Sequence, residues 1–92
     1  MTGQIKISVE RELLVVESEP YVVYTRRGYT PVIDVEHVHT GVKGFLVITA
    51  MSLAEPLHRI QEQNGGTLVG TTLSIQKENK SRMAAYVVEC LV

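Results

Sequence analysis

Short stretches rich in Val, Ile and Thr recur along the whole chain, and they limit its fold more than any other feature. These three residue types supply 28 of the 92 residues. Their β-branched side chains are stiff in helices and pack well on a pleated surface, so they favour sheet over helix. With 45% hydrophobic and 21% charged residues the chain is globular rather than disordered. We expect one domain spanning residues 1–92.

The first strongly extended region runs from Leu13 to Thr25 and is interrupted in its middle. The interruption, residues 17–20, ends in Pro20, which cannot donate a hydrogen bond to a neighbouring strand. Two interpretations remain open: two strands in a hairpin, or one long strand that bends. Residues 5–9 alternate with period two, so residues 1–12 are either an arm or an extra strand.

Two further pairs of strands are predicted, one on each side of a single helix. The first pair is separated by a turn with two glycines and the second by a polar turn. The predicted strands are residues 30–38, 45–50, 71–77 and 85–92.

The helix is predicted to begin at Ser52, whose hydroxyl can accept a hydrogen bond from a free backbone N–H group. Glu55 three residues later completes an S-x-x-E capping box. Asn64-Gly65-Gly66 is a strong stop signal, since these residue types tolerate the left-handed conformation that closes a helix. A narrow apolar stripe follows the helical spacing: Leu53, Leu57 and Ile60.

The predicted order is three strands, a helix and two more strands, with the first strand long and interrupted. This order matches the OB-fold, a five-stranded, partly open Greek-key barrel. We therefore expect a mainly β protein with a five-stranded OB-like barrel, one end of which is covered by the short helix between strands three and four. The alternative is another small α+β sandwich with the helix on one sheet face.

The C-terminal half carries three short patterns on these elements. They are Ser52-Leu53-x-x-x-Leu57, Gly66-x-Leu68-x-Gly70-x-x-Leu73-x-Ile75 and Tyr86-x-Val88. Together they resemble small OB-fold single-stranded nucleic-acid-binding proteins. The resemblance covers about residues 44–92, and the first half of the chain matches only in its order of elements. It implies an OB-like fold and a single-stranded nucleic acid as partner.

The charges are nearly balanced in number but unevenly distributed. A formal net charge of −1 excludes a protein that coats duplex DNA by general electrostatic attraction. Two predicted segments, residues 26–29 and 77–82, hold five of the nine cations and one of the ten acids. In an OB-fold these segments flank the oligonucleotide-binding face. The predicted phosphate contacts are Arg26, Arg27, Lys77, Lys80 and Arg82. The other interpretation is that these are ordinary solvated turns whose lysines protect the strand edges.

Binding of a single strand also needs flat groups on which bases stack, each worth ~1–3 kcal/mol. Tyr24 and Tyr29 flank the arginine pair, and Tyr86 follows the second basic turn. We expect Tyr29 to stack because it falls in a predicted loop. Tyr86 and Phe45 have a second interpretation as core residues, which we favour for Phe45.

The sequence shows no catalytic signature such as G-x-S-x-G or a P-loop, so we expect no enzyme activity and no cofactor. His37 and His39 occupy alternate strand positions and are the one hint of a metal site. A third ligand could come from Asp34, His58 or Cys90, but nothing in the sequence places any of them nearby. We therefore expect no metal: His37 continues the face of Ile33 and Val35, and His39 lies in the turn. Cys90 falls on an apolar strand and is expected to be buried and inert.

No stretch approaches the ~20 apolar residues that span a bilayer, and the first residues lack the apolar region of a signal peptide. A lone cysteine suits a reducing compartment, so we expect a cytoplasmic protein without a membrane partner. The leading hypothesis is a non-catalytic domain that binds single-stranded nucleic acid, DNA before RNA. The alternative is a protein-interaction module that forms a homodimer through the acidic stretch Glu10–Glu19 and a free strand edge.

Overall fold

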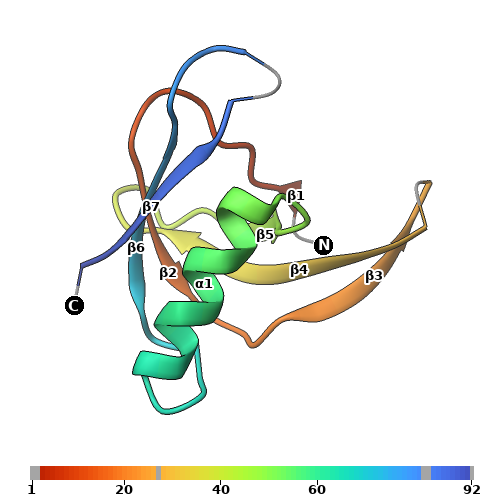
Figure 1. Ribbon diagram of the computed structural model, residues 1–92, viewed down its shortest axis with the longest axis vertical. Coiled ribbons are helices and arrows are strands. Elements are labelled where there is room, and N and C mark those ends of the chain that lie inside the picture. Colours follow the sequence, from red (N-terminus) through yellow and green to blue (C-terminus); the bar gives the residue numbers. More distant parts are fainter. Residues whose placement is uncertain (1–2, 27, 82–83, 92) are drawn as a thin grey trace.

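Seven strands and one helix make up the regular structure of the described residues. The computed structural model describes residues 3–26, 28–81 and 84–91 (Figure 1). The mainly β prediction with a helix between two pairs of strands is confirmed. The elements are β1 (Gly3–Gln4), β2 (Glu12–Val16), β3 (Tyr21–Thr25), β4 (Gly28–His37), β5 (Lys43–Val47), α1 (Met51–Gln63), β6 (Thr72–Lys77) and β7 (Tyr86–Cys90).

The strands form one mixed sheet in the order β1-β5-β4-β2-β6-β7, and β3 also pairs with β4. β2 is at the centre of this order, antiparallel to β4 on one side and to β6 on the other. The half of the acidic stretch that lies in β2 is therefore enclosed by neighbouring strands.

The interrupted region from residue 12 to residue 25 is one long strand with a bend. β2 and β3 run along β4 in succession: Val16 faces Val35, and Tyr21 faces Val32. Four residues, 17–20, thus lie opposite only two residues of β4, and this mismatch forces the strand to bulge and bend. The hairpin interpretation is wrong, because the described residues of β2 and β3 pair with β4 and not with each other.

The prediction of a five-stranded barrel is wrong, because the sheet has seven strands and remains open. Closing the five-strand path from β5 through β4, β2 and β6 to β7 would require β5 to pair with β7. That edge of β5 is instead occupied by β1, which pairs in parallel with Gly44 and Phe45. The backbone N–H of Ile5 extends this contact by donating to the Phe45 carbonyl at 2.8 Å.

One apolar cluster lies between the sheet and α1. The strands contribute side chains such as Leu14, Ile33 and Leu73, which are fully buried, and α1 contributes Leu53, Leu57 and Ile60. Each such aliphatic side chain stabilises the fold by ~1.5–3 kcal/mol through burial. The predicted helical stripe is thereby confirmed.

The sequence predicts the C-terminal end of α1 correctly but not its N-terminal cap. The N-cap is Ala50, which makes no side-chain capping hydrogen bond, so the predicted capping box is wrong. Ser52 lies in the first turn, and its Oγ accepts a hydrogen bond from the Tyr86 backbone N–H at 3.0 Å. Ser52 therefore fastens the helix to β7. The predicted stop is confirmed, since Gly65 and Gly66 have φ of 72° and 91°.

Candidate nucleic-acid interface

β3 and β4 continue beyond the core as a two-stranded hairpin that projects from the body of the molecule (Figure 1). Thr25 pairs with Gly28, and Arg26 lies in the turn between the two strands. Gly28 has φ of 101°, a conformation that glycine adopts without steric cost. β4 begins at Gly28, so Tyr29 lies within a strand and its predicted placement in a loop is wrong.

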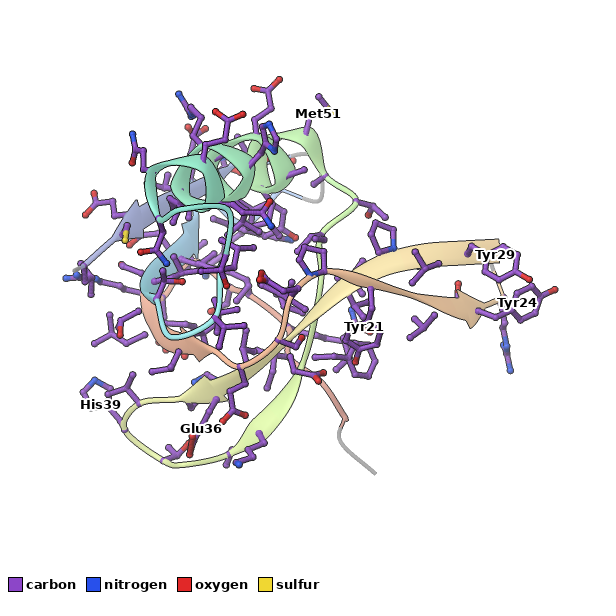
Figure 2. All side chains as sticks on the ribbon, turned by 90° about the horizontal axis from the view of Figure 1, so that it is seen from below. Tyr21, Tyr24, Tyr29, Glu36, His39 and Met51 are labelled. Carbon is purple, nitrogen blue, oxygen red and sulfur yellow. The ribbon has the colours of Figure 1, made fainter. Side chains whose placement is uncertain are left out.

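Tyr24 and Tyr29 lie together at the end of this hairpin (Figure 2). They are cross-strand partners and are 77% and 79% exposed, more than the other aromatic side chains of the described chain. Their ring centroids are 5.3 Å apart at an interplanar angle of 70°. This edge-to-face arrangement is worth ~0.5–1.5 kcal/mol and leaves most of each ring in water. The pair is a preformed aromatic platform; we call it the tyrosine pair.

An apolar face leads from the core to the tyrosine pair. Residues at alternate strand positions share a face, so Tyr29 and Pro31 continue the side of β4 that carries the buried Ile33. Val22 faces Pro31 from β3 and is 59% exposed. α1 covers the sheet near the core but does not reach along the hairpin (Figure 2). The hairpin therefore extends the core-facing side of the sheet into solvent.

The base of the hairpin is fixed by polar contacts on its other face. The Tyr21 hydroxyl donates to Asp34 Oδ1 at 2.6 Å, and the Asp34 backbone N–H donates to Ser18 Oγ at 2.9 Å. The hydrogen bond to Asp34, followed by burial and the charge of Asp34, raises the pKa of the Tyr21 hydroxyl above its ordinary value. These contacts join the bend to the centre of β4 and hold the hairpin in its orientation.

The charge at the tip is positive. Arg26 is exposed in the turn beside the tyrosine pair, while Arg27 lies outside the described residues. The nearest acids in the sequence are Glu19 and Asp34, each seven positions from the nearer arginine. The tip therefore combines two aromatic rings and the cationic side chain of Arg26 without a carboxylate close in sequence.

β6 and β7 form a second projecting hairpin with its own cations. Lys77 and Tyr86 are cross-strand partners, and the Lys77 Nζ lies 5.6 Å from the centre of the Tyr86 ring. Tyr86 is half-buried and packs against the core cluster. Lys80 is exposed in the turn, and Arg82 lies outside the described residues.

Phe45 lies apart from both tips. It is half-buried, faces Asp34 across the β4–β5 pair and is not part of the core cluster between sheet and helix. The alternation expected from the sequence is correct, since the neighbouring Leu46 is 2% exposed and belongs to that cluster. Phe45 therefore occupies the sheet face turned away from α1.

The structure does not bring the two basic turns together. They end separate hairpins that project in different directions, and the N-terminal segment, residues 3–8, runs between them (Figure 1). The sequence predicted both cationic clusters and the aromatic residues near them. It did not reveal that Tyr24 and Tyr29 would be cross-strand partners and the most exposed aromatic residues.

The remaining candidates for chemistry are not clustered. His37 Nδ1 lies 3.3 Å from Glu12 Oε2, and His39 is in the turn after β4, as predicted (Figure 2). Among the described residues, no three potential metal ligands gather. Cys90 is exposed, so its predicted burial is wrong. The reason is that β7 is the last strand of the sheet and has no neighbour beyond it in the described chain.

The chain was compared with protein-family models, curated proteins and solved structures, and none gave a significant match. The part of the chain that the structure describes contains no helix with the length and apolar character needed to cross a membrane.

Proposed function

We propose that this protein binds single-stranded nucleic acid without catalysing a reaction, and that the β3–β4 hairpin makes the principal contact. The tyrosine pair beside Arg26 carries the proposal. Exposed aromatic rings contribute to single-strand binding by stacking on bases, while neighbouring cations attract the phosphate backbone. The OB-like order of elements, with its bent first strand, is compatible with this function.

A single strand fits the tip better than a duplex. In a duplex the faces of the bases are already stacked on one another, so exposed rings gain little from them. Binding through phosphates alone would need many cations, and the chain has a net charge of −1. We place DNA before RNA among the single strands, and the experiment compares the two.

The test is fluorescence anisotropy with labelled single-stranded DNA, single-stranded RNA and duplex DNA at low and at moderate salt. Tyr24→Ala with Tyr29→Ala should weaken single-strand binding by about tenfold or more, the equivalent of one lost stacking contact. Tyr24→Phe with Tyr29→Phe should retain most of the affinity, because the rings remain. Met51→Ala, which removes an exposed apolar side chain on α1 away from the hairpin, is the control and should leave the affinity unchanged. Absence of binding at low salt would refute the proposal, as would unchanged affinity in the double alanine variant.

Self-association through a strand edge is the second candidate. In the described chain β7 pairs only with β6, and β3 pairs only with β4, so each has one edge open to another strand. β2 does not offer such an edge, which removes the half of the acidic stretch that lies in β2 from this hypothesis. Sedimentation equilibrium distinguishes the two candidate functions. A dimer that does not bind oligonucleotides would favour self-association over nucleic-acid binding.

A further inference from the structure

The place where the sheet fails to close contains a small cavity. It has a volume of about 280 Å³ and lies where the N-terminal segment passes between β5 and the β6–β7 hairpin. We call it the seam pocket. Its lining includes Lys6, Lys77, Tyr86, Gln4 and Thr49. The lining thus holds two lysines and three residues that carry a phenol, an amide and a hydroxyl, and none of the described residues that line it is Asp or Glu.

The backbone around the seam pocket is held by contacts from three directions. The Lys77 N–H donates to the Ser8 carbonyl at 2.9 Å, and the Ile5 N–H donates to Phe45. The Tyr86 N–H donates to Ser52 of α1. Ile7, next to Lys6, is 8% exposed and belongs to the core cluster. The backbone at both lysines is therefore held in place by these hydrogen bonds and by the packing of Ile7 in the core.

We propose that the seam pocket binds a phosphomonoester. A phosphomonoester carries a charge of about −1.5 to −2 near neutral pH, which two lysines can balance, and its oxygens accept hydrogen bonds from ammonium, amide and hydroxyl donors. Ligand pockets usually measure ~300–1,000 Å³, so a cavity of this size suits one terminal group rather than a run of nucleotides. The phosphate belongs either to a free nucleotide or to the end of a strand, and the latter case rests on the proposed function.

The first experiment follows backbone amide resonances while inorganic phosphate, a nucleoside monophosphate or the matching nucleoside is added. The phosphate-bearing probes should shift resonances of residues 4–7, 49–50, 77 and 86, and the nucleoside should not. Lys6→Met and Lys77→Met keep the length of the side chain but remove its charge. Each should weaken the phosphate response by about tenfold or more, the usual effect of losing a charged hydrogen bond.

Lys43→Met is the matched control, because Lys43 is exposed, pairs with Glu17 at 3.6 Å and does not line the pocket. Circular dichroism confirms that each variant is folded. Resonance shifts spread over all lysine-bearing surfaces, or equal weakening by Lys43→Met, would overturn the proposal. So would a phosphate response that survives both pocket variants.

The second experiment separates the two sources of phosphate. An oligonucleotide with a 5′-phosphate should bind more tightly than its 5′-hydroxyl counterpart if the pocket holds a strand end, and this difference should vanish in Lys6→Met. Equal binding of the two oligonucleotides, together with a local response to the monophosphate, assigns the pocket to a free nucleotide. If no oligonucleotide binds but the monophosphate response remains, the proposed single-strand binding is refuted and the phosphomonoester site in the seam pocket is supported.

Discussion

Glu19 joins two segments that are far apart in the sequence. Its carboxylate accepts hydrogen bonds from the Thr67 hydroxyl at 2.6 Å and from the Leu68 backbone N–H at 2.8 Å. Leu68 is buried in the core, so the contact ties the bend before β3 to the loop after α1. The Leu68 and Thr67 hydrogen bonds lower the pKa of Glu19 below its ordinary value of 4.5.

This shift predicts a specific pH dependence at the scale of one residue. A lowered pKa in the folded state means that ionised Glu19 adds stability that is complete above pH 4.5 and is lost as the pH falls through the folded-state pKa. Glu19→Gln should therefore lower the melting temperature at neutral pH, and the gap to the wild type should narrow in acid. Thermal unfolding followed by circular dichroism measures both.

Glu55→Gln, on the exposed surface of α1, is the control for loss of a carboxylate. If the melting temperatures of the wild type and Glu19→Gln differed equally at neutral and at acidic pH, the stated role of the Glu19 charge would be contradicted.

At the scale of elements, the docking of β1 on β5 depends on Gly44. A Cβ atom built at this position would lie 2.5 Å from the Gly3 carbonyl oxygen and 2.8 Å from the Ile5 side chain. The Gly3 oxygen belongs to the backbone and cannot move aside without displacing the strand. Gly44 is therefore required for the close approach that keeps the N-terminal segment on this edge of the sheet.

Gly44→Ala should destabilise the fold by about 1–3 kcal/mol, the usual cost of forcing an extra group into a packed site. Urea unfolding measures the free energy, and hydrogen exchange at the Ile5 amide reports whether the segment detaches. Gly3→Ala is a close control, because a Cβ at Gly3 meets nothing within 4 Å. If Gly44→Ala and Gly3→Ala lowered the free energy of unfolding equally, the loss would come from replacing a glycine and not from impaired docking of β1.

At the scale of the whole molecule, the near-zero net charge limits how binding can respond to salt. For a protein that binds a single strand, the logarithm of the affinity plotted against the logarithm of the salt concentration has a slope of about −0.7 for each neutralised phosphate. If the five predicted cations all contact phosphates, the slope reaches about −3.5. We expect a value no steeper than this, with a residual affinity at high salt that comes from the tyrosine pair.

Anisotropy titrations over a series of salt concentrations measure this slope. Arg26→Ala should make it shallower by about 0.7, while Tyr24→Ala should lower the affinity and leave the slope unchanged. A slope much steeper than −3.5 would show that cations outside the two basic turns carry the interaction.

The sequence by itself determined the features that depend on a few neighbouring residues. Strand faces follow the alternation of apolar and polar side chains, as at Ile33 and Val35. The helix stop follows from the conformational freedom of Gly65 and Gly66, and Pro20 marks the interruption of the first extended region, while the choice between a bend and a hairpin came from its pairing with β4. The faces, the stop and the interruption are fixed by local sterics and periodicity, so the residues that decide each of them lie within one element or turn.

The tertiary structure alone decided which segment occupies each edge of the sheet. Residues 3–4 and β7 both had the backbone donors and acceptors to pair with β5, and local sequence does not rank them. The outcome depends on close packing between Gly3, Gly44 and Ile5, which are brought together only by the fold. That choice leaves the sheet open, separates the two basic hairpins and creates the seam pocket between them.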